Sequence, residues 1–288
     1  MITRIAPTPS GFIHTGNVFN FLLNWLWARS NRGKVLLRID DGDAQRKRTE
    51  YVEDIFRVLE WLELEWDLGP SGPEDFEKNW SQSTRHELYF SVLNELKNKN
   101  LLFACNCSRN NKLLDTESMQ CLCVDKKYDL LQPGLSWKFK VPEKISVRVI
   151  DKHQGNLTMS IPADDRSFIV KRKDNIPAYQ ICSLMDDRHF GVTHICRGND
   201  LLPSSAIQVY LDNQLEIPHL QNCTFWHHPL ISAADGVKLS KSAGACGVSI
   251  RHTISKQQLI QSFAQWMGFH NGTVMSLKDM MHEDIFKV

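Results

Sequence analysis

Residues 3–17, TRIAPTPSGFIHTGN, and residues 35–43, VLLRIDDGD, are the part of the sequence that most clearly indicates the fold. Residues 3–6 have the composition of a short strand, and residues 7–11 hold prolines and a glycine, which predict a turn or loop. Residues 17–29 are apolar enough for a buried helix, and residues 35–43 begin as a second buried strand. A strand, a helix and a strand in this order predict a right-handed parallel unit.

Two segments of this unit are placed to bind a ligand. In open parallel sheets, ligands bind beyond the carboxyl ends of the strands. The Pro-rich loop at residues 7–11 follows the first strand, and the Asp-rich segment at residues 40–43 follows the second. We therefore expect the functional site at this edge of the sheet, and we assign the chain to the α/β class with a Rossmann-type parallel sheet.

The rest of the chain continues as a mixture of helices and strands. Helices are expected from their caps and apolar faces, and shorter strand-like runs lie between them. The predicted elements are a helix capped by Thr49, a helix with a Thr84–Glu87 capping box, strands at 146–150, 167–170 and 192–196, and a tail helix with a Ser255–Gln258 capping box.

The composition is that of a folded globular protein. Hydrophobic residues make up 42% of the chain and charged residues 23%, which excludes a disordered or fibrous protein. The net charge is +1, from 34 basic and 33 acidic residues, which argues against non-specific nucleic-acid binding by charge alone. No apolar run is long enough to span a membrane, and residues 1–4 do not open a secretion signal. We expect a cytoplasmic protein that acts as a monomer.

The first chemical motif is the loop and helix start at residues 7–17. The start of a helix presents unpaired backbone N–H groups and the positive end of the dipole, which suits a phosphate. Gly16 allows a phosphate or a base to approach the backbone, and His14 can donate a hydrogen bond to a phosphate oxygen. On its own, the stretch also fits a Pro/Gly turn with an ordinary histidine.

The second motif is residues 235–244, DGVKLSKSAG. Its two lysines, Lys238 and Lys241, lie among serines and glycines, which is typical of a cationic loop. Such a loop can close over a polyphosphate and stabilise charge that develops in a transition state. A solvated surface loop is the alternative for this stretch alone.

Together, and in this order, the two motifs resemble the HIGH and KMSKS signatures of class I aminoacyl-tRNA synthetases. Further stretches are similar to the glutamyl branch of this family, and the resemblance runs from residue 2 to about residue 245. These stretches are LRIDDGD at 37–43, PAY at 177–179, MDD at 185–187 and GVTHICRGND at 191–200. The resemblance implies an ATP-dependent ligase.

The length of the sequence after the lysine loop indicates which members of the glutamyl branch the chain resembles most. Only residues 246–288 follow, with room for one or two helices, whereas glutamyl-tRNA synthetases carry a long helical anticodon-binding region there. The shorter architecture resembles the glutamyl-Q-tRNA(Asp) synthetases, which activate glutamate and attach it to queuosine, the modified wobble base of tRNA(Asp). The resemblance therefore implies ATP, glutamate and tRNA(Asp) as partners, with Mg²⁺ accompanying ATP.

The resemblance also implies roles for individual residues. His14 and Lys241 would act in catalysis. ATP would be held by His14, Gly16, Asn17, Lys238 and Lys241. Glutamate would be bound by Arg4, Ala6, Thr8, Asp40, Tyr179 and Arg197. Within that set, Arg4 and Arg197 would face carboxylates, and Asp40 would face the ammonium group.

The chain departs from the family pattern within the stretches that carry the resemblance. Asp40 is one methylene shorter than the family's glutamate, Gly42 replaces a threonine, Gln180 an asparagine, Asn199 an acid and Ile207 an arginine. An enzyme with a different amino acid or acceptor is therefore one alternative. A non-catalytic, synthetase-like module that binds amino acid, nucleotide or RNA is another.

Four of the eight cysteines form two close pairs, at residues 105–107 and 121–123. The thiols of Cys105, Cys107, Cys121 and Cys123 suit a tetrahedral structural zinc site. The region around them has little apolar periodicity, so a metal would stabilise it. Tyr128 is a rival ligand, because the glutamyl branch also uses a tyrosine. Four unrelated buried cysteines are the alternative.

These observations divide the chain into four segments. Residues 1–85 form the first half of the Rossmann-type catalytic domain, and residues 86–175 form a zinc-bearing, acceptor-binding insertion. Residues 176–245 form the second half of the catalytic domain with the lysine loop. Residues 246–288 form a short helical tail in place of an anticodon-binding domain.

Overall fold

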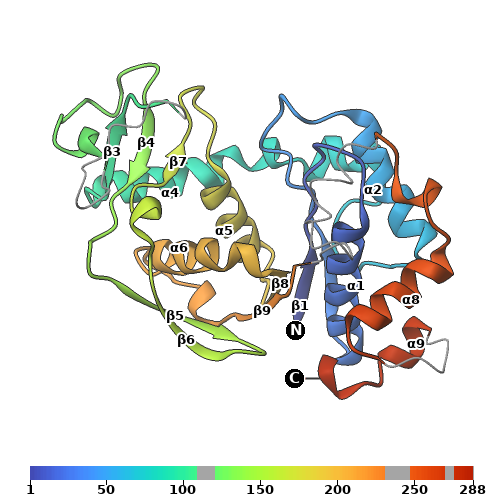
Figure 1. The fold of residues 1–288 in the computed structure, drawn as a ribbon. Coiled ribbons are helices and arrows are strands. Elements are labelled where there is room, and N and C mark those ends of the chain that lie inside the picture. The colour runs from blue at the N-terminus through green and yellow to red at the C-terminus, as the bar shows by residue number, and fades with distance from the viewer. Residues whose placement is uncertain (109–120, 231–246, 270–275, 288) are drawn as a thin grey trace. The chain divides into compact units, whose positions relative to one another are not determined.

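The structure, a computed structural model, describes residues 1–108, 121–230, 247–269 and 276–287 (Figure 1). The chain forms two compact units. The first contains residues 1–84, 192–199 and 226–288, and the second contains residues 85–191 and 200–225. The four segments expected from the sequence were assigned by their expected functions, whereas these two units are defined by contacts within the structure. The four segments therefore stay a prediction.

The first unit is built on the predicted strand, helix and strand. β1 (Ile2–Ile5) and β2 (Lys34–Leu37) pair in parallel, and α1 (Thr15–Ser30) connects them. β8 (His194–Gly198) lies beside β1. The parallel α/β class predicted from the sequence is therefore confirmed.

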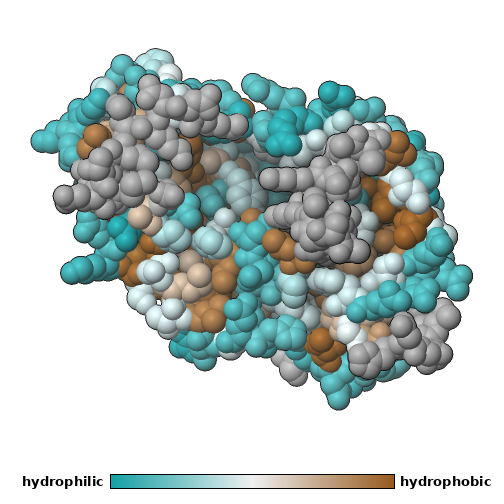
Figure 2. Space-filling model, in the orientation of Figure 1, coloured by the Kyte–Doolittle hydropathy of each residue, from teal (hydrophilic) through white to brown (hydrophobic). Residues whose placement is uncertain are grey.

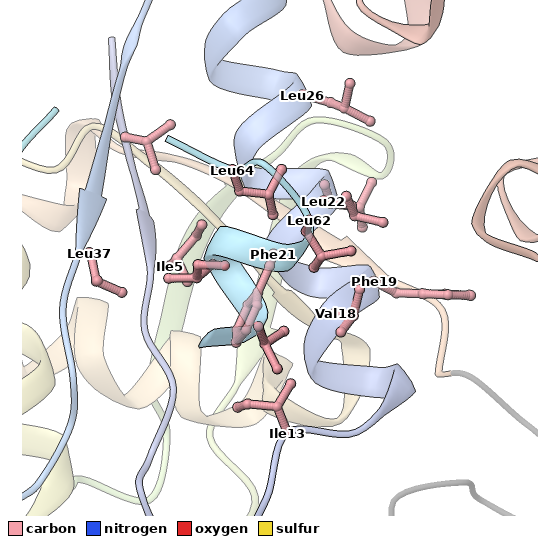
Figure 3. Packing of buried hydrophobic residues seen from close by; sticks show 14 of the residues in the cluster. Ile5, Ile13, Val18, Phe19, Phe21, Leu22, Leu26, Leu37, Leu62 and Leu64 are labelled. Carbon is pink, nitrogen blue, oxygen red and sulfur yellow. The ribbon is translucent and has the colours of Figure 1, made fainter. Parts of the chain in front are cut away.

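Helix α1 is buried on most of its surface because apolar side chains occur all round it. Leu22, Leu26 and Trp27 are fully buried. Figure 3 shows side chains of α1 filling the space beside the two strands, together with Ile5 and Leu37. Burying each large apolar side chain contributes roughly 1.5–3 kcal/mol. This core holds the carboxyl ends of the strands rigidly in place.

The described part of the first unit has further helices, and all but the shortest of them bury side chains in the same core. These helices are α2 (Thr49–Trp61), the short α3 (Pro73–Asp75), α8 (Lys256–Trp266) and α9 (Leu277–Met280). Phe263, Met280 and Phe286 from the tail are fully buried in it. The Asn31 side chain, just beyond α1, donates to the Phe286 carbonyl at 2.6 Å. The tail is therefore part of the core and not an appendage.

The second unit combines helices with small antiparallel sheets. Its helices are α4 (His86–Asn98), α5 (Tyr179–His189) and α6 (Leu202–Asp212). One sheet has the order β3 (Leu102–Cys105), β4 (Ser136–Phe139) and β7 (Ile169–Lys171). β5 (Ser146–Asp151) and β6 (Gly155–Ser160) form a hairpin, and β5 meets the start of β9 (Thr224–His228) in parallel.

Two of the three predicted helix caps are wrong. Thr49 is the first residue of α2, and the N-cap is Arg48, which makes no side-chain cap. Thr84 lies inside a 3₁₀ turn that precedes α4, and its hydroxyl donates to the Ser81 carbonyl at 2.7 Å. The Ser255–Gln258 capping box is confirmed. A cap needs an extended N-cap backbone as well as a suitable residue type.

The face drawn in Figure 2 is polar over much of its area, with apolar patches between the polar residues. Single exposed apolar residues such as Leu131, which is 69% exposed, are ordinary on a protein surface. Within the described ranges, none of the helices has the length and apolar character that crossing a membrane requires.

Candidate active site

The Pro-rich loop and the Asp-rich segment lie side by side at the carboxyl ends of β1 and β2. The parallel pairing continues beyond the strands. The Arg38 N–H donates to the Ile5 carbonyl at 2.9 Å, and the Asp40 N–H donates to the Pro7 carbonyl at 2.9 Å. Each segment is therefore held by the other at the edge where such sheets bind their ligands.

His14 caps helix α1 with its side chain. Its Nδ1 accepts a hydrogen bond from the Gly16 N–H at 3.1 Å, and its own N–H donates to Asn17 Oδ1 at 3.2 Å. Because Nδ1 is an acceptor, the neutral ring carries its hydrogen on Nε2. Burial lowers the pKa of His14, since the imidazolium is poorly solvated there. A neutral ring that donates through Nε2 suits the expected contact with a phosphate oxygen.

Gly16 makes room for this ring. A Cβ at Gly16 would lie 3.0 Å from His14 Cε1, closer than side chains pack. The Gly16 amide is also bonded to His14, and Asn17 completes the cap. Gly16 and Asn17 therefore orient His14, while their direct contact with ATP stays a prediction.

Arg4 and Arg197 are buried on neighbouring strands of the first unit. Each is 4% exposed. Arg4 lies in β1, and its Nη1 donates to the Cys196 carbonyl at 3.1 Å. β8 begins at His194 rather than at residue 192, so Arg197 lies within the strand and not after it. The carbonyl that Arg4 contacts belongs to the residue next to Arg197, which brings the two positions close together.

Asp40 forms a buried ion pair with Arg38. Arg38 Nε lies 2.6 Å from Asp40 Oδ1, and Arg38 Nη2 lies 3.0 Å from Oδ2. The two side chains are only 2% and 8% exposed. The carboxylate expected to face a substrate ammonium group is thus already paired with a cation of the protein.

Asp41 anchors the Asp-rich segment to the turn that precedes α4. Its carboxylate accepts from the Ser81 hydroxyl at 2.7 Å and from the Gln82 N–H at 2.8 Å. Lys47 Nζ lies 3.1 Å away. Burial disfavours the charged form of Lys47, but hydrogen bonds to Glu77 and Asp41 outweigh it and raise the pKa of this lysine. The segment that carries Asp40 is therefore fixed on both sides.

Gly42 is packed against Gln82. The Gly42 N–H donates to Gln82 Oε1 at 2.7 Å, and a Cβ at Gly42 would lie 2.9 Å from the same oxygen. A threonine at this position would require the Gln82 amide group, at the end of a flexible side chain, to shift. The contact gives a physical reason for the glycine.

Of the other predicted site residues, three are described by the structure and two are not. Ala6 is half-buried and Thr8 is exposed, both in the first unit. Tyr179 is the first residue of α5 in the second unit and is 45% exposed. Lys238 and Lys241 lie outside the described residues. The binding roles of all five stay predictions.

A buried charged cluster in the second unit was not predicted. Asp186 of α5 accepts from Arg85 Nε at 2.7 Å and from the Tyr89 hydroxyl at 2.7 Å, and its side chain is fully buried. Burial disfavours a charged Arg85, but Asp186 raises the pKa of the guanidinium. Burial and the Asp186 charge also raise the pKa of Tyr89. The cluster fastens α5 to α4, and its sequence signal was the MDD stretch at 185–187, which the family resemblance included without assigning Asp186 a role.

The four paired cysteines come together in the second unit. Their Sγ atoms all lie within 4.8 Å of one another. Neighbouring sulfurs are 3.6 Å apart for Cys105 and Cys121, 3.9 Å for Cys107 and Cys121, and 3.7 Å for Cys107 and Cys123. Zn–S bonds of about 2.3 Å in a tetrahedron place the sulfurs about 3.8 Å apart. The cluster therefore fits zinc, and the alternative of four unrelated cysteines is wrong.

Burial favours the neutral thiol form of two cysteines in the cluster. Burial raises the pKa of Cys105 to about 12 and also raises the pKa of Cys121. A bound metal reverses this preference, because it stabilises the thiolate directly. Tyr128 packs against the cluster, but four sulfurs already complete a tetrahedral set without it.

The fold and the site together define a class of protein. A histidine-capped helix opens at the carboxyl ends of two parallel strands, beside buried arginines, which is the arrangement of a nucleotide-binding α/β catalytic domain. The chain belongs to the family described as tRNA synthetases class I (E and Q), catalytic domain, whose match covers residues 1–281. It is therefore a member of an enzyme family of ligases.

Two relatives show how far the likeness extends. The chain is 36% identical over 251 residues to glutamyl-Q tRNA(Asp) synthetase of Pseudomonas putida strain GB-1, which covers 87% of this chain and 80% of that protein. It is 34% identical over 260 residues to glutamate–tRNA ligase 2 of Rhodospirillum rubrum, which covers 86% of this chain and 52% of that protein.

A solved structure has the same fold. The crystal structure of glutamate–tRNA synthetase from Elizabethkingia anophelis matches with a TM-score of 0.78 at 23% identity, over 100% of this chain and 66% of that chain. At this identity the likeness concerns the fold alone.

Proposed function

We propose that this protein activates glutamate with ATP and transfers it to a tRNA, with queuosine of tRNA(Asp) as the acceptor. The observation that carries this proposal is the 36% identity to a glutamyl-Q tRNA(Asp) synthetase over most of both chains. Such an enzyme works where ATP and tRNA are available, and we expect it to act in the cytoplasm as a monomer.

The proposed reaction has two steps. An oxygen of the glutamate α-carboxylate attacks the α-phosphorus of ATP, and the bond to the β-phosphate breaks to release pyrophosphate. An acceptor hydroxyl then attacks the carbonyl carbon of the adenylate, and AMP leaves with the bonding electrons. The protein contributes mainly position and positive charge to the first step.

We assign the amino acid site to the edge of β1 and β8. Buried arginines are well suited to bind carboxylates in bidentate contacts, and the Arg4 side chain bonds the carbonyl of the residue next to Arg197. Asp40 is the proposed partner of the ammonium group, so it would share its carboxylate between that group and Arg38. Ala6 and Thr8 complete the part of the proposed glutamate site that the first unit carries, and a glutamate contact by Tyr179 of the second unit stays a prediction.

We assign the ATP site to the start of α1 and to the lysine loop. His14 would donate from Nε2 to a phosphate oxygen, and Gly16 and Asn17 would support it. Lys238 and Lys241 would balance the charge of the phosphates as pyrophosphate departs. Mg²⁺ would enter with ATP as its counter-ion.

We further propose a structural zinc ion held by Cys105, Cys107, Cys121 and Cys123. The spacing of their sulfurs supports this assignment. All four ligands come from the protein, so no position is open for catalysis. When bound, the ion would cross-link the strand β3 to the turn at Leu122–Val124.

Two observations support second candidates. Asp40 is one methylene shorter than the family's glutamate and is paired with Arg38, and this altered site supports an enzyme that uses a different amino acid. The 34% identity to a glutamate–tRNA ligase supports transfer to the 3′ end of a tRNA instead. A non-catalytic binding module would bind ATP without exchanging pyrophosphate.

Two assays separate these candidates. ATP–pyrophosphate exchange with each of the twenty amino acids tests activation and specificity. Transfer of labelled glutamate to tRNA(Asp) with and without queuosine tests the acceptor, and a tRNA(Asp) that lacks its 3′-terminal adenosine controls for ordinary charging. Exchange that depends on glutamate, followed by transfer only to queuosine-bearing tRNA, is the expected result. Exchange without transfer to queuosine would refute the proposed acceptor.

A further inference from the structure

Asp54 of helix α2 contacts the backbone immediately before the predicted ATP-binding histidine. Its Oδ2 accepts a hydrogen bond from the Ile13 N–H at 2.9 Å, and the residue is 2% exposed. Ile13 is followed directly by His14, the N-cap of α1. A buried carboxylate is costly unless it is bonded. The contact therefore holds both partners strongly.

A second contact reaches Ile13 from the tail of the chain. The Ile250 N–H donates to the Ile13 carbonyl at 3.0 Å, from a 3₁₀ turn at Ile250–His252. The next residue, Arg251, places its Nε 3.7 Å from Asp54 Oδ1. The Ile13 N–H is thus bonded to Asp54, and the Ile13 C=O is bonded to Ile250. Ile250 is the neighbour of Arg251, which faces Asp54.

We propose that Asp54 is a positioning residue for the ATP site, acting on His14 through Ile13. The Arg251–Asp54 pair would also hold the loop before His14 next to residues 250–252, which follow the predicted lysine loop in sequence. The inference rests on the proposed function, because it takes His14 as an ATP contact. Small displacements of a positioned group lower rates strongly, so a backbone anchor this close to His14 matters for ATP more than for the amino acid.

The decisive variant is Asp54→Ala, compared with Asp54→Asn. An asparagine oxygen can still accept from the Ile13 N–H, whereas alanine leaves that buried amide unbonded. We expect Asp54→Ala to raise the Kd and KM for ATP by about tenfold or more, and to change the KM for glutamate by less than about twofold. Asp54→Asn should keep the KM for ATP within about threefold of wild type.

A stability control separates positioning from general damage. Val58→Ala removes a fully buried side chain from the same helix and should lower the Tm by making a cavity. It should leave the ratio of the two KM values unchanged. The inference is overturned if Asp54→Ala leaves the KM for ATP unchanged, or if it raises both KM values together as a weakened fold would.

The Arg251 contact is tested by a double-mutant cycle. Arg251→Gln should raise the KM for ATP by about threefold in the wild-type chain, because it removes the charge that faces Asp54. In the Asp54→Asn background the same change should have no further effect, since no carboxylate remains to pair. Equal effects in both backgrounds would overturn the pairing. This cycle stays informative even where Asp54→Ala fails to fold.

The measurements distinguish this inference from the proposed function. Wild-type protein that binds ATP but shows no glutamate-dependent exchange would refute the proposed function, and the Kd series would still test Asp54. If the wild-type protein shows exchange and Asp54→Ala leaves the Kd and KM for ATP unchanged, only the positioning role is refuted.

Discussion

Arg38 holds Asp40 with two charge-assisted hydrogen bonds, of 2.6 and 3.0 Å, in a position that solvent scarcely reaches. The pair lies just beyond the end of β2, where the proposed substrate site begins. A carboxylate in this state serves two purposes, because it neutralises a buried cation and can also receive an ammonium group. Its substitution therefore has separate consequences for folding and for activity.

Asp40→Asn should destabilise the protein by about 3–5 kcal/mol, because it removes the negative charge that pairs with the buried Arg38 guanidinium. Urea unfolding measures this loss directly. The double variant Arg38→Met/Asp40→Asn should recover most of the stability, since neither charge remains. Equal stability of Asp40→Asn and wild type would mean that the ion pair contributes nothing in solution.

Asp40→Glu should keep glutamate-dependent exchange or lower the KM for glutamate, because it restores the carboxylate reach found in the family. One carbon–carbon bond moves the carboxylate by about 1.5 Å. If the site has been retuned for another amino acid, the variant should instead lose activity on that amino acid. Exchange assays across the twenty amino acids decide between the two outcomes.

Lys241→Ala should lower pyrophosphate exchange by roughly 100- to 1000-fold, the effect of removing one preorganised charge from a transition state. Lys287→Ala is the control, because that lysine pairs with Asp284 in the tail. Full activity of Lys241→Ala would show that this loop takes no part in adenylate formation.

Freshly reduced protein should contain one zinc ion per chain by metal analysis. Cys121→Ser should lose the metal and unfold the region around β3 locally, because four thiolates are needed to close the tetrahedron. Cys223→Ser is the matched control, since Cys223 is also buried but lies outside the cluster. A zinc content unaffected by Cys121→Ser would contradict the assignment.

The stability of the protein should fall as the pH drops below about 6.5, the ordinary pKa of histidine. The pKa of His14 is lowered in the folded state, so the unfolded chain binds a proton more readily and acid favours unfolding. His14→Asn keeps a helix cap without a titrating ring. Its Tm should therefore decline less than that of wild type between pH 7.5 and 5.5, and parallel pH profiles would contradict this.

Local sequence patterns predicted the strand–helix–strand unit and the cysteine cluster. The apolar run of α1 between a Pro-rich loop and a second strand indicated a parallel unit, and the spacing of the cysteine pairs indicated their cluster. The Arg38–Asp40 pair could also have been foreseen, because residues two apart in an extended strand share a face. The family resemblance instead directed attention to the substrate.

Other features depend on packing between distant segments. Asp186 meets Arg85 and Tyr89 only because α5 packs against α4, and no local pattern encodes that approach. The chain leaves α1 through Arg32, which has a left-handed backbone, and the Gly33 N–H then bonds the Ala28 carbonyl. Thr49 and Thr84 failed as caps because cap geometry is set by the preceding chain.

The discontinuous first unit has a consequence for how the protein is made. Its core joins residues 1–84 to Phe263, Met280 and Phe286, which are synthesised well after α1. At about 5–20 residues per second, the stretch between α1 and Phe263 takes on the order of 10–50 s to translate, and Phe19 of α1 lacks its ring partner Phe263 during that time. The second unit, whose residues end at Phe225, is complete earlier. Nascent chains should therefore depend on chaperones through their N-terminal helix until the tail emerges.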